Sequence, residues 1–403
     1  MKSLIVFKTH SFPNVSETFI VSNIIETIKK GHIIKIIVDT INSKTNTSQQ
    51  ELVQNYKLMD KVSVMIHPDL KKERNIKALF LLCNPVLCYY FIRYSLYKKK
   101  KSLDYIFTLN YYLKYRKAKA FHVHFASAIE PLFELKKIGF LKSKIVVTFH
   151  GFDAHFLPTS ERLDVLKNDF HNYVECVTVN SLYLKKKLLA KGFTNEKIKI
   201  IPIGIDTSFF DANGDNKKES NFFKVITVGR LTELKGQSYG INAIKLLIDK
   251  GYKIDYTLVG TGDELESLKK LVVKLNLEKF IHFYGIGSQL EIKKLLSENQ
   301  LFLMTSTNDK FERSEAFGVV SLEAQAMGLP IIGFKSGGFV ETIIEGETGI
   351  TVNNRDYHEM ANQIEFLMNN VEKRLYMGSI ARQHIKEKYD ISMLTTKYLD
   401  LYS

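Results

Sequence analysis

Short β-branched segments alternate with amphipathic helical segments along the whole chain of 403 residues, and this alternation constrains the fold more than any other feature. The helical segments carry apolar residues at a period of 3.6, as in the stripe Leu265, Leu268, Leu271, Val272 and Leu275. The segments expected to be strands are 4–8, 33–38, 62–66, 122–125, 145–149, 177–179 and 198–201 in the first half, and 225–228, 256–259, 281–284, 301–304 and 331–334 in the second. Strands that alternate with helices predict parallel sheets covered on both faces. The chain is therefore predicted to be an α/β protein with two doubly wound, Rossmann-like domains.

A polar, turn-prone stretch between residues 205 and 220 separates the two runs of strands. It includes the segment DANGDNKK at 211–218. We therefore expect an N-terminal domain at 1–205 and a C-terminal domain near 221–384. Two facing domains of this kind form a cleft, and open α/β sheets bind ligands beyond the carboxyl ends of their strands. The loops that follow the strands are thus the expected carriers of function.

The charge of the chain is unevenly distributed. Lys and Arg number 57 against 43 Asp and Glu, and residues 71–120 alone hold thirteen basic and two acidic side chains. Such a block predicts an anionic partner, but no nucleic-acid recognition motif accompanies it, so we expect no nucleic-acid partner. Three irregularly spaced cysteines favour neither a disulfide framework nor a zinc site. Because no signal peptide precedes the first predicted strand, a cytoplasmic location is expected.

The loop after the predicted strand 225–228 carries two cations, in the order Gly229, Arg230 and then Lys235. An arginine and a lysine on one loop can converge on a diphosphate, the first as a fork and the second as a point charge. Positive charge at this position would stabilise a departing nucleoside diphosphate. The alternative is a solvated basic loop.

The segment 315–349, EAFGVVSLEAQAMGLPIIGFKSGGFVETIIEGETG, is the richest in functional signals. Gly318 is expected to begin a helix, and the amides from Gly318 to Val320, including that of Val319, form a candidate diphosphate cradle at its start. A carboxylate just before the helix, Glu315, can accept hydrogen bonds from sugar hydroxyls, and Glu323 inside the helix can reach a ribose. The alternative is a pair of solvated glutamates.

Two further loops are candidates for the nucleotide site. The segment LVGTGDE at 258–264 places Gly260 and Gly262 between a strand and a helix, but it lacks the full dinucleotide fingerprint because Leu265 stands at the last glycine position. The next strand ends at Gly285, and residues 284–287 are expected to form a wall beside the base. We find no Asp-x-Asp pair at a strand end and predict no metal requirement and no tightly bound cofactor.

These motifs resemble those of the retaining family 4 glycosyltransferases of the GT-B fold. EAFGVVSLEAQAMGLPII is similar to the family pattern E-G-F-G-x-x-x-x-E-A-M-A-x-G-x-P, with Ala316 in place of a common Gly and Gln325, expected on the helix flank, in place of a common Met. The segment 229–236 resembles the family loop G-R-x-x-x-x-K-G, and the V-G-x-G turn is also shared. The resemblance extends over nearly the whole chain.

The resemblance implies transfer of a sugar, a hexose, from a nucleotide-diphosphate donor with retention of the anomeric configuration. UDP- or GDP-sugars are the expected donors, and a glycan or lipid-linked glycan is the expected acceptor. The phosphates would meet Arg230 and Lys235, the donor sugar Glu315, and the ribose Glu323, with Gly229 and Phe317 also at the donor. The resemblance further implies that a C-terminal helix, 385–403, crosses back to pack on the acceptor-binding N-terminal domain.

Histidines at two predicted strand ends of the first half are further candidates. His150 follows the strand 145–149 and precedes a glycine, and the resemblance places a donor-sugar contact there, although a lone histidine is more often structural. His122 and His124 fall on one face of the preceding strand and are expected to be structural.

The first loop reads HSFPNVSETF at 10–19 and resembles a branch of the family that builds bacterial exopolysaccharides of the colanic-acid type. Ser16, Glu17 and Thr18 are expected on the acceptor side. Asn14 and Glu17 also have capping-box spacing, so plain helix capping stays an alternative.

The segment 78–97, ALFLLCNPVLCYYFIRYSLY, is apolar and is followed by four lysines. A membrane span is disfavoured by Asn84, Pro85 and Arg93, because an arginine at mid-membrane costs about 2.5–3.5 kcal/mol. Two short helices lying on the inner face of an anionic membrane fit better, and an ordinary core helix pair with a solvated basic face is the alternative. Two other functional classes also stay open, an inactive sugar-nucleotide-binding subunit and a GT-B relative such as an epimerase or phosphorylase.

Overall fold

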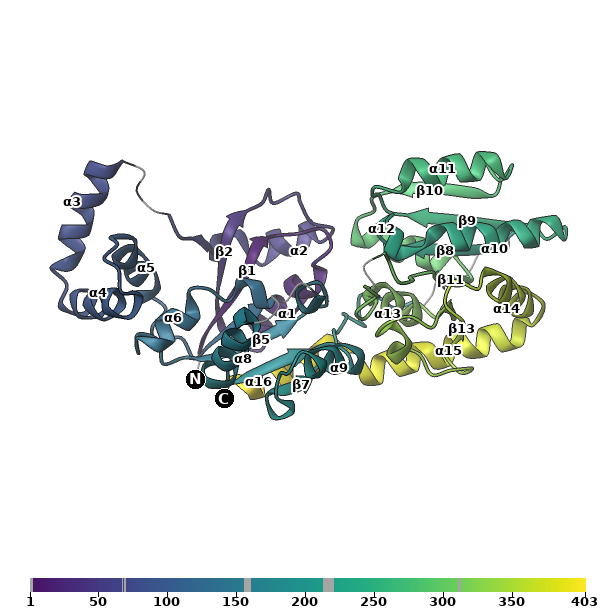
Figure 1. Ribbon diagram of the computed structural model, residues 1–403. Coiled ribbons are helices and arrows are strands. Elements are labelled where there is room, and N and C mark those ends of the chain that lie inside the picture. Colours follow the sequence, from purple (N-terminus) through teal and green to yellow (C-terminus); the bar gives the residue numbers. More distant parts are fainter. Residues whose placement is uncertain (1–2, 67, 69, 156–160, 213–220, 311–312) are drawn as a thin grey trace. The chain divides into compact units, whose positions relative to one another are not determined.

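The computed structural model describes residues 3–66, 68, 70–155, 161–212, 221–310 and 313–403 (Figure 1). The chain divides into two compact units. Unit 1 comprises Met1–Val179, Lys187–Ile200 and Thr396–Ser403, and unit 2 comprises Asn180–Lys186 and Ile201–Thr395. The second half of the predicted linker, residues 213–220, lies outside the described residues.

Unit 1 is built on a seven-stranded parallel sheet with the order β3-β2-β1-β4-β5-β6-β7. Its strands are β1 (Leu4–Phe12), β2 (Ile33–Ile41), β3 (Val62–Val64), β4 (Ala120–His124), β5 (Lys144–Phe149), β6 (Cys176–Val179) and β7 (Ile198–Ile200). The central strands are almost wholly buried and rich in Ile and Val, as expected for a sheet with helices on both faces. The seven predicted strands of the first half are therefore all present.

The helices that accompany this sheet are mostly short. They are α1 (Thr18–Lys29), α2 (Gln50–Asn55), η1 (Met59–Lys61), α3 (Lys71–Leu82), α4 (Pro85–Lys98), α5 (Asp104–Leu113), η2 (Ala126–Ala128), α6 (Leu132–Lys137), α7 (Phe152–His155), α8 (Glu161–Tyr173), α9 (Leu182–Ala190), whose residues up to Lys186 belong to unit 2, and η3 (Asn195–Lys197). Figure 1 shows α3, α4 and α5 gathered at one end of unit 1. These three helices carry most of the basic block 71–120 and lie between β3 and β4 in the chain.

Unit 2 is built on a six-stranded parallel sheet with the order β10-β9-β8-β11-β12-β13. Its strands are β8 (Phe223–Val228), β9 (Ile254–Val259), β10 (Ile281–Gly285), β11 (Leu301–Met304), β12 (Ile331–Phe334) and β13 (Gly349–Val352). The accompanying helices are η4 (Glu233–Lys235), α10 (Gln237–Asp249), α11 (Leu265–Lys274), α12 (Gln289–Glu298), α13 (Val319–Ala326), η5 (Phe339–Thr342), α14 (Tyr357–Asn369) and α15 (Val371–Lys388). Apolar residues of α10, α11 and α14 join those of the strands in one buried core. The predicted stripe on α11 supplies Leu268 and Val272 to it.

The end of the chain differs in detail from the single helix predicted at 385–403. The helix α15 ends at Lys388 and a separate helix, α16 (Ile391–Tyr402), follows. The last residues, Thr396–Ser403, belong to unit 1. There the hydroxyl of Tyr402 lies 2.6 Å from Nδ1 of the buried His122 on β4.

In both sheets the first strand along the chain is an interior strand and not an edge strand. The first strand of unit 1, β1, lies between β2 and β4, and the first strand of unit 2, β8, lies between β9 and β11. The direction in which strands are added therefore reverses beside β1 and beside β8. Open α/β sheets bind ligands outside the carboxyl ends of the strands at such reversals. The loops after β1 and β4, and those after β8 and β11, are thus the places where the topology favours a site.

Candidate functional site

In unit 2, the loop after β8 is fastened to the loop after its neighbour β11. The hydroxyl of Thr305 donates to the carbonyl of Lys235 over 2.7 Å, and the amide of Thr307 donates to the carbonyl of Leu234 over 2.9 Å. Gly236, at a φ of +58°, approaches so closely that a Cβ there would lie 2.4 Å from the carbonyl oxygen of Thr305. This packing fixes the backbone from which the Lys235 side chain extends.

Lys235 and Glu315 form an ion pair at this position. The ammonium contacts Oε2 of Glu315, and the hydroxyl of Ser306 donates to the same oxygen over 3.2 Å. The two charged side chains are only 18% and 14% exposed. Burial alone would raise the pKa of Glu315, but the charge and hydrogen bond of Lys235, the Ser306 hydroxyl and the charge of Arg230 outweigh it and hold that pKa below its ordinary value. The carboxylate is therefore ionised and oriented at neutral pH.

The start of α13 lies beside the same carboxylate. Gly318 is the N-cap residue at a φ of +81°, and a Cβ there would stand 3.5 Å from Cγ of Glu315 and 2.8 Å from Cε of Met304. A glycine N-cap has no side chain to satisfy the first amides of a helix, so these amides stay available to a ligand. Lys235 and the turn at Gly318 thus meet at Glu315, and the charge of Arg230 acts on the same carboxylate.

A Gly-Gly turn supports Glu315 from its other side. The amide of Gly338 donates to the carbonyl of Glu315 over 2.8 Å, and a Cβ at Gly337 would lie 2.0 Å from that oxygen. The two glycines are therefore required for the backbone contact that places Glu315.

Glu323 and Gln325 lie inside α13 and are both buried. Glu323 is 6% exposed, and burial raises its pKa to about 8, so the free protein holds this carboxyl protonated at neutral pH. The expectation that Gln325 lies on the helix flank is wrong. Its side chain is fully buried, and its amide donates to the carbonyl of Thr342 over 3.0 Å. A glutamine here links α13 to η5, a hydrogen bond that the methionine common in the family could not make.

The predicted donor-binding residues on either side of Gly318 differ in which of their atoms a ligand could reach. The ring of Phe317 is 2% exposed and packs near Tyr389 at a centroid distance of 6.0 Å. Only its backbone is thus left for a donor contact. Val319 and Val320, the first two residues of α13, are half-buried and contribute the amides of the first turn.

The glycines after β8, β9 and β10 pack the three loops together. A Cβ at Gly260 would lie 2.0 Å from the carbonyl oxygen of Gly229, and one at Gly262 would lie 2.2 Å from that of Leu231. The amide of Gly260 donates to Gly285 over 2.8 Å. The role that this geometry gives Gly260 and Gly262 is close backbone approach, which holds the Arg230 loop in place.

In unit 1, His150 follows β5 and contacts a second histidine. Its Nε2 lies 3.0 Å from Nδ1 of His124, and its ring lies 4.5 Å from that of Phe19. Burial, with the nearby His124, lowers the pKa of His150 well below its ordinary value, so the ring is neutral. His122 is fully buried and held on both sides, by Thr148 at 2.7 Å and Tyr402 at 2.6 Å. The geometry of His122 is that of a structural residue.

The capping box between Asn14 and Glu17, which was the alternative interpretation of this loop, is not formed. Helix α1 begins at Thr18, its N-cap is Glu17, and no side chain caps it. Asn14 instead donates to Glu17 Oε2 over 2.9 Å and to the Ser11 hydroxyl over 3.0 Å, and it accepts from Asn42. Ser16 is exposed, while Glu17 and Thr18 are half-buried, so this loop leaves polar groups open to solvent.

Some residues that hydrogen-bond to the loops of these sites belong to no recognisable sequence motif, so the sequence did not predict them. Asp153 is 6% exposed, and its carboxylate accepts hydrogen bonds from the amides of Ala126, His150 and Gly151. Burial raises the pKa of Asp153 to about 6 despite these bonds. Ser306 was equally unpredicted, because a serine after a strand has no distinctive pattern. Among the described residues, no group of three or more His, Cys, Asp or Glu lies where it could hold a metal ion.

Comparison with known proteins shows the family of the chain. The family model of the Glycosyltransferase Family 4 domain matches residues 60–209, and that of Glycosyl transferases group 1 matches residues 209–384. The amylovoran biosynthesis glycosyltransferase AmsK of Erwinia amylovora is 28% identical over 360 residues, 86% of each chain. The putative colanic acid biosynthesis glycosyltransferase WcaL of Escherichia coli is 26% identical over 255 residues, 62% of this chain and 61% of that protein.

Among solved structures, Anabaena HepE in complex with UDP-glucose superposes with a TM-score of 0.75 at 18% identity, covering 99% of this chain and 98% of that one. This likeness concerns the fold, and it confirms the predicted GT-B architecture of two Rossmann-like parallel-sheet domains. The two family matches together span residues 60–384, and the chain therefore belongs to the glycosyltransferases that join a Glycosyltransferase Family 4 domain to a Glycosyl transferases group 1 domain.

Proposed function

We propose that this glycosyltransferase moves a hexose from a nucleoside-diphosphate sugar to a glycan acceptor, with retention of configuration, in the synthesis of a surface polysaccharide. The observation that carries the proposal is the meeting of Lys235 and the start of α13 at Glu315, with the charge of Arg230 acting on the same carboxylate, at the strand-order reversal beside β8. A cation pair and free helix amides suit a diphosphate, and a fixed carboxylate suits the hydroxyls of the attached sugar.

The chemistry follows from where charge develops. As the bond between the sugar and the diphosphate breaks, negative charge accumulates on the leaving phosphate, and Lys235 and Arg230 stabilise it. The acceptor hydroxyl attacks on the face that the phosphate leaves and gives its proton to that departing phosphate, so positioning is the second requirement. Glu315 would hold the donor sugar and Glu323 the ribose, and the family resemblance gives His150 a contact to the donor sugar. No metal ion is assigned a role in this scheme.

The donor and its base are inferred from similarity. HepE was crystallised with UDP-glucose, and UDP- and GDP-sugars are the donors proposed for this chain. We expect one of UDP-glucose, UDP-galactose, GDP-mannose or ADP-glucose to raise the melting temperature. A ligand at 100 times its dissociation constant adds about 2.7 kcal/mol to the free energy of unfolding. The absence of a shift with every one of these sugar nucleotides would count against the donor site.

The same screen separates the proposal from its alternatives. An active transferase slowly hydrolyses the donor that it binds, whereas an inactive binding subunit shows the thermal shift without hydrolysis. An epimerase converts the donor to an isomer that product analysis detects. A covalent pyridoxal lysine would mark a phosphorylase.

The acceptor is proposed to be a lipid-linked glycan, with Ser16, Glu17 and Thr18 on the acceptor side. The relatives AmsK and WcaL are named for the biosynthesis of amylovoran and colanic acid, which suggests a polysaccharide product here. A lipid-linked acceptor would require the enzyme to work at the inner face of the cell membrane.

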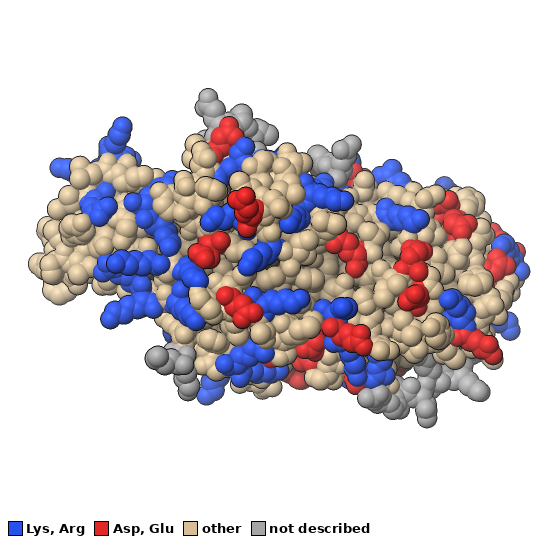
Figure 2. Space-filling view, turned by 90° about the horizontal axis from the view of Figure 1, so that it is seen from below, with Lys and Arg blue, Asp and Glu red and all other residues tan. Residues whose placement is uncertain are grey.

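The helices α3 and α4 are proposed to make that membrane contact. No single helix among the described residues has the length and hydropathy of a membrane span, while one bent pair, Lys72–Leu82 with Pro85–Lys98 at 114°, satisfies both together. The pair presents large apolar side chains to solvent, with Phe80 at 78% and Leu96 at 72% exposure. Further exposed apolar residues are Ile76, Leu79, Val86, Tyr89, Ile92 and Tyr97. Figure 2 shows Lys and Arg side chains bordering an uncharged area at this end of unit 1.

This pattern fits an anionic membrane better than an ordinary core helix pair. A core pair would bury its large apolar residues, whereas among the described side chains of α3 and α4 only Ala78, Leu87 and Tyr94 are buried. Each buried aromatic or aliphatic side chain contributes about 1.5–3 kcal/mol, and each nearby Lys or Arg adds about 1 kcal/mol at an anionic surface.

We expect the paired substitution Leu79→Glu/Phe80→Glu to reduce binding to vesicles of phosphatidylglycerol and phosphatidylcholine at least tenfold. The reason is that it removes two exposed apolar groups and adds two like charges facing the lipid. The matched control is Val273→Glu/Leu290→Glu, which changes two comparably exposed residues of unit 2. Co-sedimentation measures both. Equal loss in the two variants, or no binding by the wild-type protein, would contradict the membrane assignment.

A further inference from the structure

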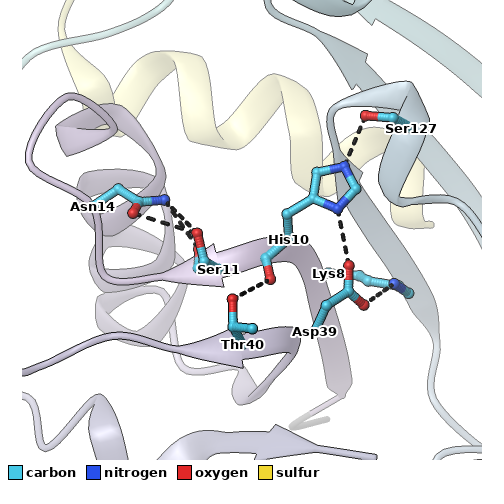
Figure 3. Close-up of polar contacts among 7 residues, drawn as sticks. All are labelled: Lys8, His10, Ser11, Asn14, Asp39, Thr40 and Ser127. Atoms are coloured by element: carbon cyan, nitrogen blue, oxygen red, sulfur yellow. Dashed lines mark hydrogen bonds and ion pairs between the residues drawn. The ribbon is translucent and has the colours of Figure 1, made fainter.

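Three polar side chains outside the predicted site meet at the strand-order reversal of unit 1. His10 lies near the end of β1, Asp39 near the end of β2, and Ser127 in η2 directly after β4. Because β1 lies between β2 and β4, the carboxyl ends of these strands are neighbours. Figure 3 shows the imidazole of His10 between the other two side chains. By topology alone, this is where unit 1 should receive its ligand.

The hydrogen bonds of His10 show which of its ring nitrogens accepts a hydrogen bond and which donates one. Its Nδ1 lies 2.9 Å from Oδ2 of Asp39, and its Nε2 lies 2.8 Å from Oγ of Ser127 (Figure 3). An ionised carboxylate can only accept, so Nδ1–H donates to Asp39. In the neutral ring Nε2 is then the acceptor, and the Ser127 hydroxyl donates to it. Nε2 of His10 is therefore positioned to accept a hydrogen bond from an alcohol hydroxyl, as it does from Ser127.

A buried ammonium anchors the Asp39 end of this chain of hydrogen bonds. Lys8 precedes His10 by two residues on β1, so their side chains share a face of the sheet, and Lys8 is only 2% exposed. Its Nζ lies 3.7 Å from Oδ1 of Asp39. Burial lowers the pKa of Lys8, and the charge of Asp39 opposes that effect. A buried cation requires a fixed counter-charge, so Asp39 is held in the orientation that also binds His10.

The Ser127 end is held by a strained turn. Phe125 adopts a φ of +70°, a conformation that is costly for a bulky residue and that often occurs at functional sites. The Asp153 carboxylate accepts from the amide of Ala126 through one oxygen and from that of His150 through the other. One buried side chain therefore ties the Ser127 loop to the loop of His150, the residue proposed to contact the donor sugar.

The site is open to a ligand. The side chains of His10 and Asp39 are 47% and 57% exposed, and Ser127 is also exposed. We propose that His10, oriented by Asp39, binds a hydroxyl group of the acceptor sugar through Nε2, and that Ser127 Oγ occupies this position in the free protein. Asp39 and Lys8 are positioning residues. This inference rests on the proposed function and adds the group that recognises the acceptor.

Two variants of His10 provide matched probes of the two ring nitrogens. In His10→Asn the side-chain amide replaces Nδ1 and keeps a partner for Asp39, but nothing replaces Nε2. In His10→Gln the amide reaches the position of Nε2 and can still accept from a hydroxyl. We expect His10→Asn to raise the KM for acceptor about tenfold, His10→Gln to raise it less, and neither to change the KM for donor.

The acceptor probes are the methyl glycosides of glucose, galactose and mannose, used with the donor identified by thermal shift. Ser127→Ala should lower the acceptor KM about threefold, because it removes the internal group that competes for Nε2. Equal acceptor KM values for wild type and His10→Asn would overturn the proposal. So would loss of all transfer in Ser127→Ala, which would instead indicate a nucleophilic Ser-His-Asp triad.

A wild-type protein that binds donor but uses none of the three glycosides also counts against a sugar-hydroxyl site. Failure to bind any donor is a different result, since it would contradict the proposed function in unit 2 and not the acceptor site in unit 1.

Discussion

Replacing Lys235 by Ala should lower turnover by about 100-fold or more, and Arg230→Ala should have a similar effect. Removing a single preorganised charge-stabilising contact costs about 2.7–4 kcal/mol in comparable sites. Lys235 is only 18% exposed and its backbone is fastened by Thr305, so the protein cannot easily substitute another cation. The measurement is the initial rate of donor hydrolysis and of sugar transfer at saturating donor.

Loss of Lys235 also leaves the Glu315 carboxylate buried without its ion-pair partner, which destabilises the fold. The double variant Lys235→Ala/Glu315→Gln removes that unpaired charge. It should therefore recover thermal stability while turnover stays low. Recovery of turnover together with stability would mean that Lys235 acts only through folding.

A matched control is Lys245→Ala, which removes a lysine from an ion pair with Asp249 on α10 of the same unit. This pair is formed within the last two turns of α10 and not in the loop after β8, so we expect turnover close to that of the wild type. Near-normal rates in both Lys235→Ala and Arg230→Ala would contradict the assignment of these cations to the diphosphate.

The sequence predicted the two motifs of this site, one around Lys235 and one around Glu315, but not that they lie next to each other. The motif around Lys235 and that around Glu315 are each recognisable locally, yet the two residues are 80 positions apart. They meet because β11 pairs with β8, a neighbour relation decided by the crossovers of the sheet and not by any local pattern. Hydrophobic periodicity gives the strands, whereas strand order depends on the packing of the whole unit.

The features that the sequence did not predict also depend on contacts between distant parts of the chain or on short elements with weak patterns. The strand β13 was missed because it is a four-residue edge strand that begins with a glycine. The expectation that Gln325 lies on the helix flank was wrong because a hydrogen bond to the backbone of Thr342 allows its burial. The proposed acceptor site could not be predicted, because His10 lies on β1, Asp39 on β2 and Ser127 after β4, and residues so far apart in the chain form no common motif.

Glu323 predicts a dependence of stability on pH that is opposite to that of most carboxyl groups. Burial raises its pKa to about 8, whereas in the unfolded chain a glutamate titrates near about 4.3. Between these values the folded protein holds a proton that the unfolded chain releases. The free energy of unfolding therefore decreases as pH rises through this window, by up to about 1.4 kcal/mol per pH unit from this group.

The variant Glu323→Gln lacks this titration and keeps the shape of the protonated side chain. We expect its stability to equal that of the wild type near pH 4.5 and to exceed it increasingly up to pH 8, as measured by urea unfolding across this range. Donor binding should weaken in the same variant, since an amide replaces the carboxyl proposed to hold the ribose.

Glu291 supplies a control of opposite sign. Its carboxylate closes the capping box of α12 by accepting from the Ser288 amide over 2.8 Å, and the hydrogen bonds from Ser288 lower its pKa. The stability that Glu291 contributes is present above the pKa of the unfolded chain and is lost as pH falls. Glu291→Gln should thus be less stable than the wild type at neutral pH and equal to it in acid. If Glu323→Gln followed that same course, the carboxyl of Glu323 would be ionised in the folded protein, and a ribose would meet a charged group instead of a neutral one.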